Sequence, residues 1–273
     1  MSFKTEWARF GKDPKHLGFC AWPERAVAPL PGLIVVQEVW GVDAHIEDVT
    51  LRFAKAGYVA LAPDLFADHG ERPASLARTR LDEIKAFIDT TRPPFAWNDP
   101  AAREEALANV SEPRRSAMKE SFSTLVTAAL GPTEAFVPRL LDAAEYLRSE
   151  QPMSRGAKVG AVGYCLGGGL SARLACADPK LSAAVIFYGS APPPGQIPNI
   201  ACPVLGMYGG LDTRINAGIA EFTAAMAQHG KRFESHVYEG AKHAFFNDTR
   251  PSYDARASRD AFSRTLEFFR REL

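Results

Sequence analysis

The sequence predicts an α/β fold with a mostly parallel central sheet and helices on both faces. Short apolar runs rich in β-branched residues alternate with segments of helical periodicity, the order typical of βαβ units. Apolar residues make up 46% and charged residues 23% of the chain, which are ordinary values for a globular protein. With 273 residues, the chain is long enough for one large α/β domain, and we expect a single domain over residues 1–273.

The predicted strands are short apolar runs, as expected where a parallel sheet is buried on both faces. Asp43 is a candidate N-cap for a helix in which Ile46, Val49 and Phe53 share one face, and Gly57 is suited to end it. In chain order, strands are expected at residues 33–37, 58–62, 158–164, 183–188, 204–208 and 234–238, with a weaker one at 17–21. Further helices are expected at residues 133–147, 166–177, 217–228 and 255–269.

Residues 66–132 interrupt this alternation. The segment contains no convincing strand, includes the stretch "TTRPPFAWNDP", and is otherwise charged and rich in helix-forming residues. We therefore expect a helical insertion that forms a cap over the C-terminal edge of the sheet, or else a solvated helical decoration without an active role.

Charge and cysteine content narrow the function classes. The chain carries 32 basic and 32 acidic residues, so no net field favours nucleic acid or an anionic membrane, and a small-molecule partner is expected. The N-terminal residues lack the apolar stretch of a signal peptide, and no run of about 18 apolar residues occurs, so we expect a cytoplasmic protein. The four cysteines are widely spaced, and no ligand spacing indicates a metal; no cofactor is implied.

The stretch "VGYCLGGG" contains the candidate nucleophile, Cys165. It follows an apolar strand and opens a helix, with Gly163 and Gly167 two positions before and after it. A nucleophile on a tight strand-to-helix turn needs small neighbours at those positions. The N-terminal N–H groups of the helix favour the thiolate form of Cys165. A buried structural cysteine is the alternative, and it is our interpretation of the other three cysteines.

A nucleophile of this type requires a base and an acid that orients the base, in the chain order nucleophile, acid, histidine. Asp212 in "YGGLDTR" and His243 in "EGAKHAFF" each follow a predicted strand, so both are expected at the same sheet edge as Cys165. Glu38 also ends an apolar strand, where an unpaired carboxylate would be costly. We expect the other histidines to lie at the surface (His16, His45, His69 and His229) or within a strand (His236).

Together these motifs resemble the dienelactone hydrolase family of the α/β-hydrolase fold. The resemblance rests on "VVQEVWGV", "GYVALAPDLF", "VGYCLGGGLSARLA", "YGGLDTR" and "EGAKHAFFN", in that order, and leaves the insertion uncovered. It implies a hydrolase that cleaves a lactone or an activated carboxylic ester, with Cys165 as nucleophile, His243 as general base and acid, and Asp212 as the orienting acid.

The resemblance also assigns supporting roles. Glu38 is expected to pair with the resting thiol and to shift when substrate binds, and the backbone amides of Leu166 and Val39 are expected to form the oxyanion hole. Asn247 stands where founding members carry an arginine that helps to bind the substrate carboxylate, and we assign Asn247 and Trp40 to substrate binding. Six arginines could replace the missing one: Arg72, Arg78, Arg80, Arg114, Arg115 and Arg250.

Several alternatives remain open from the sequence. A general carboxylesterase with a neutral substrate would use the same residues. A cysteine enzyme of the DJ-1 or class I amidotransferase type also sets a cysteine near a glutamate, but the late positions of Asp212 and His243 argue against it. A non-catalytic binding protein on a hydrolase-like scaffold and a thiol redox function without an evident resolving cysteine are the remaining possibilities.

Overall fold

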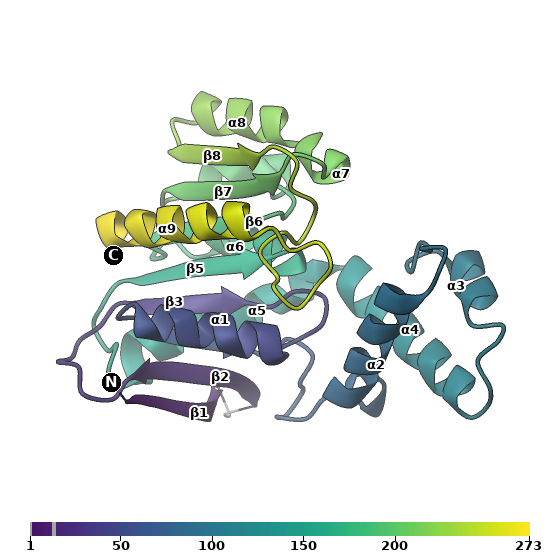
Figure 1. Ribbon diagram of the computed structural model, residues 1–273. Helices are drawn as coiled ribbons and strands as arrows, with labels where there is room; N and C mark the ends of the chain where they lie inside the picture. The colour runs from purple at the N-terminus through teal and green to yellow at the C-terminus, as the bar shows by residue number, and fades with distance from the viewer. Residues whose placement is uncertain (1, 13–14) are drawn as a thin grey trace.

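The computed structural model describes residues 2–12 and 15–273. Its centre is a sheet of eight strands in the order β1-β2-β4-β3-β5-β6-β7-β8 (Figure 1). Strands β3 to β8 run parallel, whereas β1 and β2 are antiparallel to their neighbours. The predicted fold class, a mostly parallel sheet with helices, is confirmed. The strands are β1 (Phe3–Phe10), β2 (His16–Pro23), β3 (Gly32–Val36), β4 (Val59–Pro63), β5 (Val159–Tyr164), β6 (Ala183–Phe187), β7 (Val204–Gly209) and β8 (Phe233–Tyr238).

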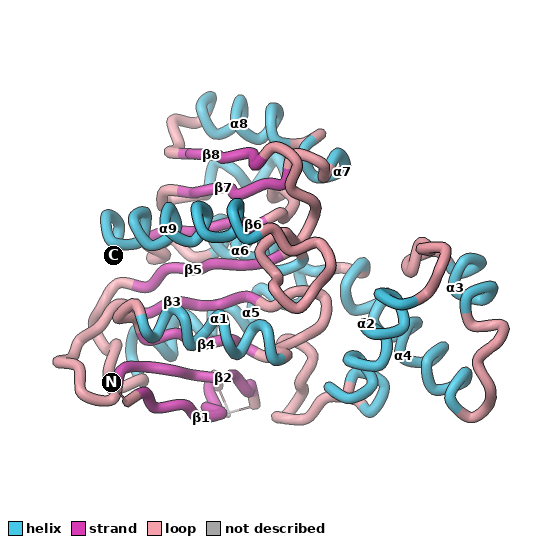
Figure 2. Tube along the Cα trace, in the orientation of Figure 1, coloured by secondary structure: helices cyan, strands magenta, loops and turns pink. Residues whose placement is uncertain are grey.

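Helices cover both faces of the sheet, because alternate side chains of each strand point to opposite faces. In β3, Ile34 and Val36 belong to one buried cluster with residues of α5, α6 and α8, while Leu33 and Val35 belong to another with residues of α1 and α9. Figure 2 shows α1 and α9 crossing the near face. These helices are α1 (Ala44–Lys55), α5 (Val137–Glu145), α6 (Leu166–Ala177), α8 (Ile219–Gln228) and α9 (Ala255–Glu272), and the short α7 (Thr213–Asn216) follows β7.

The segment between β4 and β5 is helical, and it leaves the sheet at the C-terminal ends of the parallel strands (Figure 1). It contains α2 (Arg78–Thr90), α3 (Pro100–Ala106) and α4 (Arg114–Leu130). Its apolar cluster, which includes Ile84 and Phe122, also takes in Val39 and Trp40 from the loop after β3. The insertion therefore packs against the loop that carries Glu38, next to the C-terminal sheet edge.

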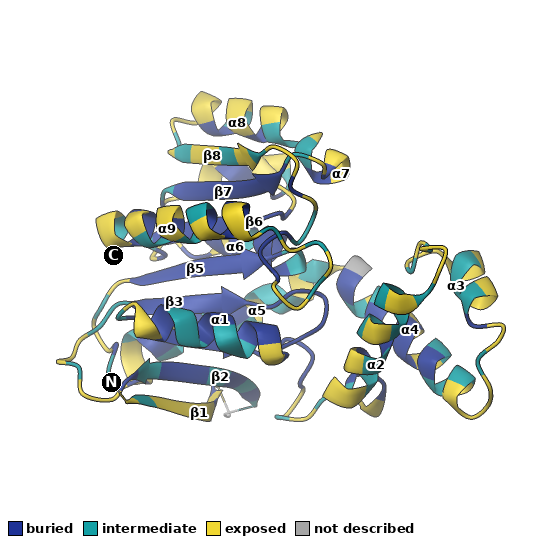
Figure 3. Cartoon of the chain, in the orientation of Figure 1, coloured by how far each residue is buried: buried dark blue, intermediate teal, exposed yellow. Residues whose placement is uncertain are grey.

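Three local expectations were wrong. Strand β1 was not predicted, because most of its side chains are exposed and polar, as Figure 3 shows for this edge strand. The helix expected over residues 133–147 is divided into a 3-10 turn (Thr133–Phe136), α5 and a π-helical turn (Tyr146–Glu150). His16 and His45 are buried rather than at the surface, because they pair with Asp142 and Asp248, which lie far away in the sequence.

Candidate active site

Cys165 lies on a strained turn between β5 and α6. Its backbone has φ 55° and ψ −114°, a region that L-residues rarely adopt and that costs free energy where it is enforced. The two flanking glycines permit the turn: a Cβ atom on Gly163 would lie 1.9 Å from the carbonyl oxygen of Gly167, and one on Gly167 would lie 2.2 Å from that of Val36. The turn therefore presents the Cys165 side chain at the sheet edge.

The structure brings Cys165, His243 and Asp212 into one hydrogen-bonded row. The Cys165 Sγ atom lies 3.2 Å from Nε2 of His243, and Nδ1 of His243 lies 2.5 Å from Oδ2 of Asp212. The three residues come from the turns after β5, β8 and β7, whose C-terminal ends meet at one edge because the strands are parallel. The row has the geometry of a nucleophile, a base and an orienting acid.

The electrostatics of the row favour a charged imidazole. Burial lowers the pKa of His243, but its hydrogen bonds to Asp212 and Cys165 outweigh that effect and raise the pKa to about 10. For Asp212, burial raises the pKa of the carboxyl group, and the contact with His243 overcomes this and lowers it. The arrangement therefore supports an imidazolium form of His243 beside the Asp212 carboxylate.

This pKa shift predicts a pH-dependent contribution of His243 to stability. Because the folded-state pKa is raised, the contribution is fully present below the unfolded value near 6.5 and is lost as pH rises to about 10. We expect the free energy of unfolding of the wild type to exceed that of His243→Gln most at pH 6, and the difference to shrink by pH 10. Urea unfolding of both proteins at the two pH values measures this, and an equal difference at both would contradict it.

Two backbone amides beside the thiol are available to bind an oxyanion. Leu166 and Val39 both line the cavity that contains Cys165. Within the described part of the chain, neither amide donates a hydrogen bond to a protein acceptor. The amide of Cys165 itself is already committed to the carbonyl oxygen of Phe187, at 3.0 Å. The predicted pair of amides is therefore in a position compatible with an oxyanion hole.

The contacts of Glu38 differ from the expected pairing of its carboxylate with the resting thiol of Cys165. Its carboxylate is buried and accepts hydrogen bonds from the Tyr188 hydroxyl at 3.1 Å and from Nδ2 of Asn247 at 2.8 Å. Among the described residues, no hydrogen bond joins Glu38 to Cys165, whose thiol contacts His243 instead. The Glu38 carboxylate bonds to Tyr188 and Asn247 instead of the thiol. The expected contact between Glu38 and the thiol is therefore not formed.

The cavity at this site has two lobes, which share Val39, Cys165, Arg214 and His243. One lobe, of about 410 Å³, is also lined by Trp40, Trp97, Asn98, Ala244, Arg250, Ser252 and Glu38, and we call it the tryptophan lobe. The other, of about 300 Å³, is also lined by α6, by the turn after β6, and by Ala129, Gly131 and Thr133 at the end of the insertion, and we call it the α6 lobe. Thus Trp40 lines the cavity as expected.

Asn247 does not have the position expected for a substrate contact. Its side chain is buried, and its two amide atoms bond to Glu38 and to Thr249. It is absent from the lining of both lobes. The structure therefore corrects the assignment: Asn247 contacts Glu38 rather than the cavity.

Of the six candidate arginines, Arg250 lies at the cavity. It pairs with Asp89 of α2 at 2.9 Å and stacks over the Trp40 ring at 5.1 Å, and its buried Nη1 atom has no partner among the described residues. The other five bond elsewhere and line neither lobe: Arg72 to Asp64, Arg78 to Glu47, Arg80 to the Ala117 carbonyl, Arg114 to Glu83 and Arg115 to the Val110 carbonyl.

Several residues that line the cavity were not predicted, among them Tyr188, Trp97 and Arg214. Tyr188, directly after β6, lies with its ring 5.1 Å from that of His243, and its position at a strand end was a usable signal. Trp97, in the insertion, and Arg214, in α7, also line the cavity. Arg214 ends the stretch "YGGLDTR" and Trp97 lies in "TTRPPFAWNDP", but nothing in either stretch indicated that these side chains reach the cavity.

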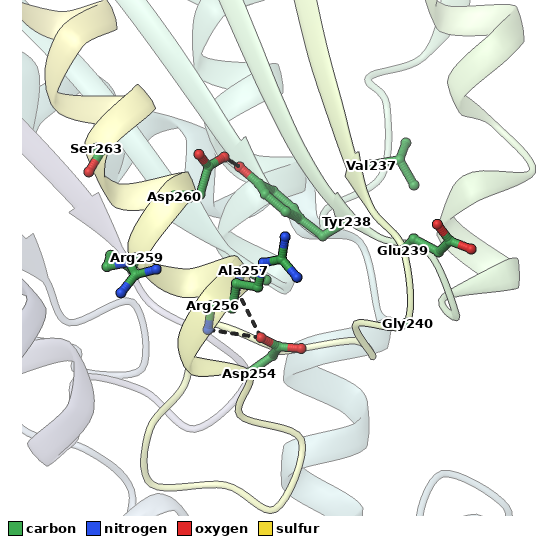
Figure 4. Close-up of a pocket in the computed structure, with 10 residues that line it drawn as sticks. All are labelled: Val237, Tyr238, Glu239, Gly240, Asp254, Arg256, Ala257, Arg259, Asp260 and Ser263. Atoms are coloured by element: carbon green, nitrogen blue, oxygen red, sulfur yellow. Dashed lines mark hydrogen bonds between the residues drawn. The ribbon is translucent and has the colours of Figure 1, made fainter.

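A larger cavity, of about 680 Å³, lies between the end of β8 and the start of α9 (Figure 4). Two of its polar groups are engaged within the chain: the Tyr238 hydroxyl donates to Asp260 at 2.9 Å, and Asp254 caps α9. None of the predicted site residues lines it.

Residues 2–12 and 15–273 contain no cluster of three side chains suited to a metal, and no helix long and apolar enough to cross a membrane. All four cysteines are free thiols.

The family model and the sequence relatives below point to one family. Residues 17–273 match the dienelactone hydrolase family. A protein of Saccharolobus solfataricus named "Putative carboxymethylenebutenolidase" is 33% identical, with 94% of each chain covered. A protein of Methylorubrum extorquens with the same name is 32% identical, covering 89% of this chain and 72% of its own.

Solved structures show the same fold. A dienelactone hydrolase-like promiscuous phosphotriesterase, P91, from metagenomic libraries has a TM-score of 0.74 at 20% identity, with 100% of this chain and 99% of its own chain covered. The dienelactone hydrolase from Anabaena variabilis has a TM-score of 0.62 at 17% identity over both full chains.

Proposed function

Because this chain belongs to the dienelactone hydrolase family, we propose that it hydrolyses a lactone or an activated carboxylic ester through a thioester on Cys165. The observation that carries the proposal is the row from Cys165 through His243 to Asp212 at the junction of the two lobes. We further propose that residues 1–273 form one hydrolase domain, into which the helices of residues 66–132 are inserted.

In the proposed acylation step, the Cys165 thiolate attacks the carbonyl carbon of the substrate. The amides of Leu166 and Val39 stabilise the resulting oxyanion, and the loss of one such donor typically costs about 100- to 1,000-fold in turnover. The C–O bond to the leaving group then breaks. His243 donates its proton to the departing alkoxide or enolate, and Asp212 stabilises the imidazolium form before that transfer.

In the proposed deacylation step, His243 removes a proton from water, and the hydroxide attacks the thioester carbonyl. The C–S bond breaks, the carboxylic acid product leaves, and the thiolate returns. A thiolate nucleophile is poorly matched to expelling an amine, so the site suits activated esters and enol lactones, whose leaving groups are stable, better than amides.

Arg250 supplies a test of whether the substrate is an anion. A hydrogen bond to a charged group is worth about 1.5–3 kcal/mol, or about 10- to 150-fold. If Arg250, whose buried Nη1 atom has no partner among the described residues, binds a substrate carboxylate, Arg250→Met lowers kcat/KM by that factor more for dienelactone than for neutral p-nitrophenyl acetate. The matched control is Arg115→Met in the insertion, outside both lobes.

Steady-state hydrolysis of cis- and trans-dienelactone beside p-nitrophenyl acetate measures these effects. A kcat/KM for dienelactone above about 10⁴ M⁻¹s⁻¹ places it in the range of enzyme substrates. Cleavage of the neutral ester alone would favour the second candidate, a carboxylesterase that acts on uncharged substrates. The absence of Cys165-dependent hydrolysis of either class would overturn the proposed function.

A further inference from the structure

The nucleophile lies where two lobes of the cavity meet, rather than at the end of a single pocket. Cys165, His243, Val39 and Arg214 line both lobes. The tryptophan lobe measures about 410 Å³ and the α6 lobe about 300 Å³. Since a cavity of about 150 Å³ is enough to hold benzene, each lobe has room for a group the size of a ring.

This arrangement matches the shape of an open-chain ester. When a thiolate attacks the carbonyl carbon, the acyl and alcohol portions extend in different directions from the reacting atom. A compact lactone joins both portions in one ring and would fill one lobe only. Two lobes on either side of the thiol therefore fit a substrate with two separate groups.

The tryptophan lobe has an aromatic wall formed by residues from two parts of the chain. The rings of Trp40, in the loop after β3, and Trp97, in the insertion, lie with centroids 6.0 Å apart at an interplanar angle of 43°. Trp40 is buried and is covered by the guanidinium of Arg250, which fixes its position. Trp97 is half-buried, so part of its indole is open to a ligand.

Aromatic walls select planar rings over saturated rings of similar size. Stacked or edge-on ring pairs gain about 0.5–1.5 kcal/mol beyond the burial of their surface, or about 2- to 12-fold per pair. The α6 lobe has no such wall: within the described chain, its aromatic lining residues are Tyr188 and His243 beside the thiol. Leu166, Leu170 and Ile215 supply apolar surface. Its polar lining residues are Thr133, Ser190, Arg214 and Arg173, the last of which pairs with Glu134 at 2.7 Å.

We infer that the substrate class of this enzyme is an open-chain ester with a planar, unsaturated or aromatic group in the tryptophan lobe and an aliphatic group in the α6 lobe. This inference rests on the proposed function and narrows its substrate. Trp97 is then a specificity-determining residue that the helical insertion contributes to the active site.

Two ester pairs test the aromatic wall. Benzyl acetate is compared with cyclohexylmethyl acetate, and methyl phenylacetate with methyl cyclohexylacetate, so that the ring occupies the alcohol or the acyl side. In one pair, we expect the wild-type kcat/KM to favour the aromatic ester by about tenfold. Trp97→Ala should abolish that preference mainly by raising KM for the aromatic ester. Trp7→Ala, which removes a partly exposed tryptophan outside both lobes, is the matched control and should retain it.

A third comparison tests the second lobe. Benzyl butyrate adds two methylene groups to benzyl acetate, and we expect the wild type to hydrolyse it at least as efficiently. Ser190→Phe, which fills the α6 lobe from the turn after β6, should lower kcat/KM for the butyrate at least about tenfold more than for the acetate.

The outcomes distinguish failure of the inferred substrate class from failure of the proposed function. Cys165-dependent hydrolysis of p-nitrophenyl acetate together with equal rates for both members of each ring pair, or an unchanged preference in Trp97→Ala, would overturn the inference and leave the proposed function standing. Equal losses for butyrate and acetate in Ser190→Phe would overturn the two-lobed substrate. The absence of Cys165-dependent hydrolysis of both p-nitrophenyl acetate and dienelactone would overturn the proposed function itself.

Discussion

Cys165→Ala is expected to lower kcat for ester hydrolysis by about 10⁴- to 10⁶-fold, the loss typical of removing a nucleophile that acts as one unit with its base. The reason is that the Cys165 thiol lies 3.2 Å from Nε2 of His243 and that no other described cysteine lines the cavity. Turnover of p-nitrophenyl acetate and dienelactone by both proteins measures the effect.

The control for Cys165→Ala is a measurement of whether the variant keeps the wild-type fold. Alanine is smaller than cysteine and keeps the backbone, so the far-ultraviolet circular dichroism and the chromatographic volume should match those of the wild type. Cys176→Ala, on the same helix but outside both lobes, is the matched variant and should retain activity. Retained turnover in a folded Cys165→Ala protein would refute the nucleophile assignment.

His243→Ala is expected to reduce kcat by a factor on the order of 10⁴, because it removes the proton donor for the leaving group and the base for deacylation. An activated ester with a good leaving group needs less help in the first step than in the second. The variant should therefore accumulate acyl-enzyme, which intact-mass spectrometry of quenched protein detects as an added acyl group.

His229→Ala is the matched histidine variant, since His229 lies at the surface after α8 and outside both lobes. It should neither lose turnover nor accumulate an adduct. A His243→Ala protein that hydrolyses the ester at the wild-type rate would contradict the assignment of His243 as the base.

Local sequence patterns predict the central parallel strands and the turn at Cys165 well. The parallel strands are buried on both faces, so their side chains form apolar runs that are visible in sequence, and β5 through β7 begin and end within one residue of expectation. The turn at Cys165 is equally local, because the glycines two positions away are required by contacts within and beside that turn. Since parallel strands end at a common edge, the placement of Asp212 and His243 followed from the topology.

What the sequence did not predict depends on contacts between distant segments. Asn247 and Tyr188 bond to Glu38 across 209 and 150 residues, and no periodicity encodes such a pair. The sequence alone could not distinguish Arg250 from the other five candidate arginines. Its contacts with Trp40 and Asp89 come from other parts of the chain. Strand β1 is an edge strand with a mostly exposed polar pattern, so it gives no burial signal.

The most direct test of the account is to locate the acyl group formed during turnover. Wild-type and His243→Ala protein are mixed with p-nitrophenyl acetate, quenched in acid within the first turnover, digested and mapped by mass spectrometry. The account predicts an added acetyl group on the peptide that contains Cys165, which hydroxylamine removes, as expected of a thioester. Acetyl groups confined to other residues, or full hydrolysis without an adduct at Cys165 in either protein, would contradict it.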